Sequence, residues 1–187
     1  YEEGRARLER YWSLPFAPPL RIAEEEAAVE VRRLLREAVR QRLMSEVPLG
    51  AFLSGGLDSS AVVALMAEFG QVKTFSVGFQ EESFNELSYA RLVAKRYATE
   101  HHEFVVRPQV AEVLPALVEH YGEPYADSSA LATYCLARET GAHVTVALNG
   151  DGCDELFAGY PRYRLLSLPA SLDWLPAPRG LWDGLWR

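Results

Sequence analysis

An apolar run that leads into two glycines, three serines and an aspartate constrains this chain more than any other feature. Residues 49–53 have the length and composition of a buried strand. Gly55 and Gly56 follow it, and residues 61–66 are apolar in the manner of a helix. We expect that helix to have its N-cap at Asp58 or Ser59. The stretch therefore predicts a strand, a tight glycine turn and a helix N-terminus.

Such a turn is suited to bind an anion, because free backbone N–H groups and the positive end of the helix dipole point at the ligand. Gly55 and Gly56 allow close approach of the backbone. The hydroxyl groups of Ser54, Ser59 and Ser60 can add hydrogen bonds, whereas Asp58 would repel a bare phosphate and so indicates a bridging Mg²⁺. A Walker loop does not fit, since no lysine follows Gly56. A strand–helix corner without a ligand is the alternative.

Composition places the chain among ordinary globular domains: 187 residues, of which 49% are hydrophobic and 24% charged. The net charge of −7 argues against a nucleic-acid partner, and no apolar run approaches the roughly 20 residues of a membrane span. Cys135 and Cys153 lack metal-type spacing, so we expect free thiols and a cytoplasmic location. Because the chain begins with Tyr1, we expect it to be an excerpt of a longer protein.

Strand and helix patterns alternate along the chain. Strands are predicted at 49–53, 72–79, 101–106 and 144–148, and helices at 24–44, from a capping box at Ser83 onward to Tyr97, at 110–121, at 127–139 and near 155–160. This order predicts an α/β fold, a parallel twisted sheet with helices on both faces. We expect residues 1–22 to be a linker from an upstream domain, 23–164 the domain itself and 165–187 a truncated tail.

A second polar loop, residues 149–155, follows the fourth predicted strand and carries Asp151, Asp154 and Glu155. Ligands of parallel sheets bind at the carboxyl ends of the strands. If the fourth strand lies beside the first, the two glycine loops meet in one cleft, and Asp58 and Asp154 form a Mg²⁺ pair. The alternative is an acidic surface turn.

The segment Ser54 to Ser60 resembles the pyrophosphate-binding loop of ATP pyrophosphatases, in the form used by asparagine synthetases. Residues 149–155 and 160–163 resemble the second signature of that family, and the likeness extends from about Tyr11 to Tyr163. The resemblance implies an adenine nucleotide alpha hydrolase-like fold and the cofactors ATP and Mg²⁺. It implies a nucleotide site that also includes Leu53, Val77, Asn149 and Gly150, largely through backbone contacts, and Asp151 as the acid tied to acyl-adenylate formation. Asn149 departs from the serine common in the family.

The activity that the resemblance implies is amidation of aspartate through β-aspartyl-AMP, with release of AMP and pyrophosphate. Ammonia would come from an upstream glutaminase domain, and a homodimer is compatible with the family. Two alternatives stay open. One is a related carboxylate-activating enzyme, of the β-lactam synthetase or lasso-peptide cyclase type, and the other is a truncated nucleotide-binding domain without activity.

Two further patterns suggest chemistry only at first sight. His101 and His102 are adjacent in a predicted strand, so their side chains should face opposite sides of the sheet and could not easily share a metal ion. Cys153 has carboxylates as its neighbours, which raise the pKa of a thiol and make it a poor nucleophile.

Overall fold

The structure is a computed structural model and describes residues 4, 6, 8–13, 20–79, 86–106, 110–123 and 125–163. The predicted tail, most of the predicted capping box and parts of the predicted linker lie outside these residues. The chain divides into two compact units, residues 1–34 and 35–187. Helix α1 (Glu24–Arg42) begins in the first unit and ends in the second, with acidic residues in its first turn and arginines in its last, as the helix dipole favours.

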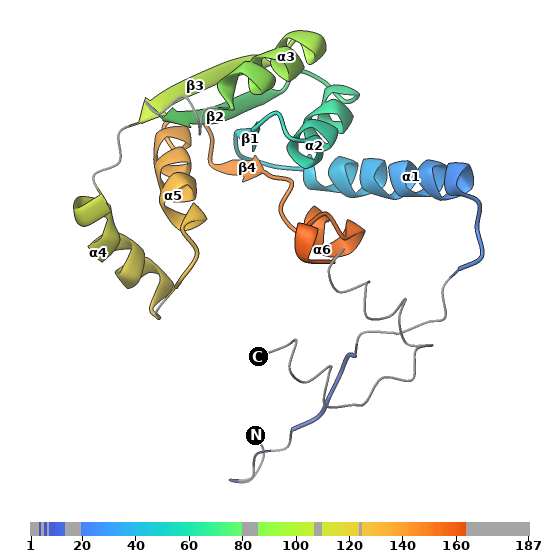
Figure 1. Cartoon of the computed structure of the whole chain (residues 1–187), viewed down its shortest axis with the longest axis horizontal. Helices are drawn as coiled ribbons and strands as arrows, with labels where there is room; N and C mark the ends of the chain where they lie inside the picture. The colour runs from blue at the N-terminus through green and yellow to red at the C-terminus, as the bar shows by residue number, and fades with distance from the viewer. Residues whose placement is uncertain are drawn as a thin grey trace, which may run out of the picture. The chain divides into compact units, whose positions relative to one another are not determined.

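The second unit is built on a four-stranded parallel sheet in the order β3-β2-β1-β4 (Figure 1). Its strands are β1 (Leu49–Phe52), β2 (Lys73–Phe79), β3 (Glu100–Val106) and β4 (Val146–Leu148). The fourth strand pairs with the first, with Leu49 opposite Val146 and Ala51 opposite Leu148. The predicted parallel sheet is thus confirmed, and so is the expectation that the last strand returns to lie beside the first.

Helices cover both faces of this sheet. The helices after α1 are α2 (Leu57–Ala67), α3 (Leu87–Tyr97), α4 (Val110–Tyr121), α5 (Ser129–Thr140) and the short α6 (Cys153–Phe157). Of these, α2, α3 and α5 pack against the sheet, whereas α4 packs on α5. Right-handed crossovers place α2 and α3 on one face, because β1, β2 and β3 progress in one direction, and α5 on the other face, because β4 lies on the far side of β1. Side chains agree: Glu103 of β3 pairs with Arg91 of α3, whereas Phe75 packs against His143, just after α5.

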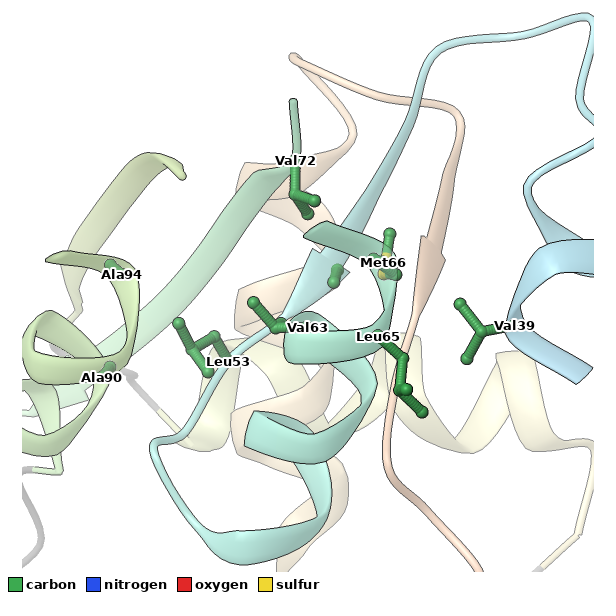
Figure 2. Close-up of a cluster of buried hydrophobic side chains, with 9 residues drawn as sticks. Val39, Leu53, Val63, Leu65, Met66, Val72, Ala90 and Ala94 are labelled. Atoms are coloured by element: carbon green, nitrogen blue, oxygen red, sulfur yellow. The ribbon is translucent and has the colours of Figure 1, made fainter. Parts of the chain in front are cut away.

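The main core lies between the sheet and α2 (Figure 2). Leu53 and Val63 are almost fully buried, and Met66 and Val39 of α1 belong to the same cluster. Burial of each such side chain contributes roughly 1.5–3 kcal/mol. This packing fixes the strand before the first glycine loop and the helix after it, so the loop between them is held at both ends.

A smaller apolar cluster joins α4 to α5 and contains Val113, Leu117 and Ala130. In the described part of the chain, no helix is long and apolar enough to span a membrane.

The start of α2 differs from the prediction. The helix begins at Leu57 with Gly56 as its N-cap and has no side-chain cap, so neither Asp58 nor Ser59 occupies the capping position. The reason is that the Ser59 hydroxyl bonds back into the glycine loop, to Ser54 and to the Gly56 carbonyl, rather than to the next N–H groups of the helix. The last helix also begins earlier than predicted, at Cys153.

Candidate functional site

The two glycine loops meet at the carboxyl edge of the sheet, where β1 and β4 end side by side. Gly150, which follows β4, lies directly against the first turn of α2. An ideal Cβ built on Gly150 would be 2.8 Å from both the Asp58 carbonyl carbon and the Ser59 nitrogen. Only glycine permits so close an approach of one backbone to another. The predicted juxtaposition of the loops is therefore confirmed.

Internal hydrogen bonds hold the first loop in shape. The hydroxyl oxygens of Ser54 and Ser59 lie 2.9 Å apart and share a hydrogen bond, and the Gly56 N–H donates to the Ser54 hydroxyl at 3.1 Å. Gly55 has φ +86°, and an ideal Cβ on it would lie 2.5 Å from backbone atoms of Tyr89 and Ala90 in α3. The loop is thus preorganised by its own serines and by contact with a second helix.

A cavity of about 570 Å³ opens beside these loops. The glycine loops form one side, the ends of β1 and β2 with the start of α3 form another, and one face of α5 with the segment before it forms a third. The lining includes Leu53, Ser54, Asp58, Ser59, Val77, Asn149, Gly150, Asp151 and Asp154 among the predicted site residues, and also Phe52, Ser76, Phe79, Glu86, Leu87, Ala90, Tyr125, Asp127, Ser129, Ala132, Thr133, Leu136, Gly152, Glu155 and Tyr160.

The charge of this cavity is one-sided. No lysine, arginine or histidine among the described residues lines it. The lining carries six carboxylates: Asp58, Glu86, Asp127, Asp151, Asp154 and Glu155. Two like unit charges about 4 Å apart repel by about 4 kcal/mol at an effective dielectric constant of about 20. A phosphate ligand would therefore need cations to enter.

Asp151 is oriented by Asn149, two residues before it. The Asn149 side-chain amide donates to the Asp151 carboxylate at 2.8 Å, and the Asp151 N–H donates to the Asn149 side-chain oxygen at 3.3 Å. This reciprocal pair aligns the carboxylate at the cavity wall.

The acidic residues of α6 surround Cys153. Burial, followed by the carboxylates of Asp58, Asp154, Glu155 and Asp151, raises the pKa of the Cys153 thiol. The thiol is therefore a poor nucleophile, as predicted. Asp58 and Asp154 both contribute to this shift of its pKa, although they are far apart in sequence.

Tyr160, shortly after α6, holds the Glu155 side chain by a hydrogen bond. Tyr160 donates its hydroxyl hydrogen to the Glu155 carboxylate at 2.8 Å, which lowers the pKa of Glu155. The guanidinium of Arg162 lies 4.1 Å from the centre of the Tyr160 ring, a cation–π contact, and it lowers the pKa of Glu155 further.

The carboxylates offer a partial metal site. No three His, Cys, Asp or Glu side chains of the described residues are grouped so that they could hold an ion alone. Asp58 and Asp154 supply the hard oxygen donors that Mg²⁺ prefers, and Mg²⁺ usually keeps water and ligand phosphate oxygens in its shell. The donor chemistry of these two lining residues therefore suits Mg²⁺.

Three predicted site residues are absent from the described cavity lining: Gly55, Gly56 and Ser60. Gly55 packs on α3, and the buried Ser60 hydroxyl has no hydrogen-bond partner among the described residues. At Leu53, the N–H already donates to the Phe75 carbonyl at 2.9 Å and the carbonyl accepts from the Ser76 hydroxyl. The Leu53 carbonyl oxygen has a second lone pair, and a nucleotide that contacts this backbone would bond to it.

The wall formed by α5 was missed at the level of sequence. Ala132, Thr133 and Leu136 follow Ser129 by three, four and seven residues, so all four share one face of the helix. The spacing is visible in the sequence. It does not decide whether a helix face of small and polar residues lines a cavity or faces solvent. Asp127, which starts this wall, accepts a hydrogen bond from the Ser129 N–H at 2.9 Å, and this lowers the pKa of Asp127.

The two adjacent histidines of β3 do face opposite sides of the sheet. His101 bonds to Thr74 at 2.9 Å on the α3 side, and His102 stacks on Phe75 on the α5 side.

The parallel sheet, with a glycine loop after β1 and an acidic loop after β4, defines a class by its fold, the adenine nucleotide alpha hydrolase-like domains. A solved structure supports the fold: glutamine-dependent NAD+ synthetase from Acinetobacter baumannii in complex with ADP, at TM-score 0.52 and 23% identity, over 79% of this chain and 29% of that one. The family model of asparagine synthase matches residues 30–187. The chain therefore belongs to the asparagine synthase family.

Individual relatives agree with this assignment. The chain is 40% identical over 164 residues to asparagine synthetase (glutamine-hydrolyzing) 1 of Bacillus subtilis, an alignment that covers 87% of this chain and 26% of that protein. It is 32% identical over 188 residues to amidase chyE of Penicillium rubens, over 88% of this chain and 28% of that protein. The chain thus spans little more than a quarter of the length of these relatives.

Proposed function

We propose that the full-length protein is a ligase that activates the side-chain carboxylate of aspartate with ATP and converts it to asparagine. One observation carries the proposal: the contact of Gly150 with the first turn of α2 joins a pyrophosphate-type loop to an acidic loop in one cavity. Family membership and the relatives named asparagine synthetase support the same reaction.

The phosphates of ATP would lie at the N-terminus of α2. Backbone N–H groups of the helix end are available there, because the helix has no side-chain cap. Ser54 and Ser59 line the cavity at this point. The loop has no lysine near the β–γ bridge, which a loop built for γ-phosphoryl transfer commonly has. It is therefore suited to hold β and γ phosphates that leave together as pyrophosphate.

Asp58 and Asp154 would hold the Mg²⁺ that accompanies these phosphates. When bound, the ion would neutralise charge that builds up on the departing pyrophosphate. The charge of the cavity supports this requirement, since all the ionisable carboxylates of its described lining are negative and no cationic side chain accompanies them.

The proposal assigns Asp151 to the step in which the acyl-adenylate forms. An aspartate carboxylate oxygen attacks the α-phosphorus, the bond from that phosphorus to the bridging oxygen breaks, and pyrophosphate carries that oxygen away. Ammonia then attacks the acyl carbon, AMP leaves with the carboxylate oxygen, and one proton of the ammonia is released. Asp151→Asn should lower turnover far more than ATP affinity, because an interaction made mainly in the transition state affects turnover rather than binding.

The route of the oxygen gives a direct test. Aspartate labelled with ¹⁸O in its side-chain carboxylate is converted with ATP, Mg²⁺ and ammonia, and the AMP is analysed by mass spectrometry. The proposal expects one ¹⁸O in the AMP phosphate for each asparagine formed. Unlabelled AMP would overturn the acyl-adenylate route.

Ammonia would come from glutamine through a glutaminase domain, a partner suggested by the name of the Bacillus subtilis relative. The domain limits 23–164, a homodimer and a cytoplasmic location stay predictions.

A second candidate is the same activation with another acceptor. The α5 wall and Tyr125 add a side to the cavity beyond the two loops, and one relative is named an amidase. Rapid release of AMP without consumption of aspartate would favour this candidate.

A further inference from the structure

A tight turn after α6 folds back onto the helix. Ala158 has φ +54°, and the Gly159 N–H donates to the Asp154 carbonyl at 3.0 Å. Tyr160, next in sequence, donates to Glu155. The segment 158–160 therefore lies against the two carboxylate-bearing residues of α6.

Gly159 touches the Asp154 side chain itself. An ideal Cβ built on Gly159 would overlap a carboxylate oxygen of Asp154, and would lie 2.8 Å from its carboxyl carbon and 3.2 Å from its Cα. The backbone of Gly159 is not among the described glycines with positive φ. Glycine is thus required at this position by the space that the carboxylate occupies and not by the backbone conformation.

We propose that Gly159 is a positioning residue, which leaves open the space that the Asp154 carboxylate occupies at the cavity wall. A methyl group at residue 159 would turn the carboxylate into another rotamer, because the two closest atoms belong to the end of a short side chain that can rotate away. The Asp154 Cα, at 3.2 Å, requires a shift of only a few tenths of an ångström. The helix would remain, while the metal ligand would move. This inference rests on the proposed function in so far as it takes Asp154 to be a Mg²⁺ ligand.

The test uses Mn²⁺ as the probe, because its unpaired electrons report binding directly in electron paramagnetic resonance. The full-length protein is titrated with Mn²⁺ in the presence of a non-hydrolysable ATP analogue. Loss of a residue that orients a metal ligand typically lowers affinity 10- to 100-fold. Gly159→Ala should show a loss of that order, and turnover should recover in part at high Mg²⁺. Equal Mn²⁺ affinity in the variant and the parent overturns the inference.

Gly141→Ala is the matched control. Gly141 has a helical φ of −58°, a Cβ there would lie 3.4 Å from the nearest carbonyl oxygens, and the residue is not part of the described cavity lining. Mn²⁺ affinity should be unchanged in this variant.

A double-mutant cycle separates the positioning role from the metal assignment. Gly159→Ala is compared by thermal unfolding, without metal, in the parent and in Asp154→Ala, which has no carboxylate to displace. Gly159→Ala should lower the Tm in the parent by a few degrees and in Asp154→Ala by less. If the parent itself binds no Mn²⁺ with the analogue, the metal assignment fails, and the cycle alone decides. Equal Tm shifts in both backgrounds overturn the positioning role.

Discussion

Replacing Gly150 by alanine adds one methyl group at the contact between the two loops. The new Cβ would lie 2.8 Å from the Asp58 carbonyl carbon and the Ser59 nitrogen, and 2.9 Å from the Asp58 Cβ. Two of these atoms are backbone, so no side-chain rotation relieves the clash. To reach an ordinary contact of 3.4 Å from 2.8 Å, the loops must separate by about 0.6 Å.

Overpacking of this kind costs typically 1–3 kcal/mol. The smaller conformational entropy of the unfolded alanine variant returns about 0.4–1 kcal/mol, which leaves a net loss of about 1–2 kcal/mol. For a chain of this size we expect the Tm to fall by about 2–8 °C. The effect on the site should be larger, since a misplacement of about 1 Å can cost on the order of 100-fold in rate.

The assay measures thermal unfolding and aspartate-dependent pyrophosphate release of the full-length protein on the same preparations, with Gly141→Ala as the control. We expect Gly150→Ala to unfold at a lower temperature and to lose at least about 10-fold in turnover. Normal turnover together with a normal Tm would refute the argument that this contact joins two halves of one site.

Three further predictions concern side chains around the cavity and the sheet. Asn149→Ala should lower kcat about 10-fold and leave the ATP Kd within about twofold, because the amide orients Asp151; equal losses in both would contradict this. Tyr160→Phe should raise the pKa of Glu155 toward its ordinary value, as measured by ¹³C NMR titration. An unchanged pKa would show that the hydrogen bond from Tyr160 is not the cause of the shift. Burial lowers the pKa of His101, so its neutral form is favoured in the native state; stability should be complete above about pH 6.5 and fall as the pH drops through the lowered pKa. Urea unfolding at two pH values should show a smaller decline in His101→Gln, and identical declines would contradict the argument.

The order of strands and helices could be predicted because it depends on local patterns. The apolar run at 49–53 and the alternation at 72–79 identified two neighbouring strands within a residue or two. The general preference for right-handed crossovers then limited the topologies, and the polar loops after the first and fourth strands located the site.

Contacts between distant backbones could not be predicted. Nothing in the sequence distinguishes the surroundings of Gly55, Gly150 and Gly159. In the structure each has a different neighbour: α3, the start of α2 and the Asp154 carboxylate, respectively. The N-cap of α2 was misplaced for a related reason, since Ser59 could bond either to its own helix or back to Ser54, and only the loop geometry decides. The α5 wall needed the packing of a helix against the sheet, which no local pattern contains.

The nucleotide products test the central claim most directly. Full-length protein is incubated with ATP, Mg²⁺, aspartate and ammonia, and the nucleotides are separated by ion-exchange chromatography while phosphate and pyrophosphate are assayed. The arrangement of Asp58, Asp154 and a loop without lysine predicts AMP and pyrophosphate in equal amounts, with one asparagine for each AMP. ADP and phosphate as the main products would contradict the account.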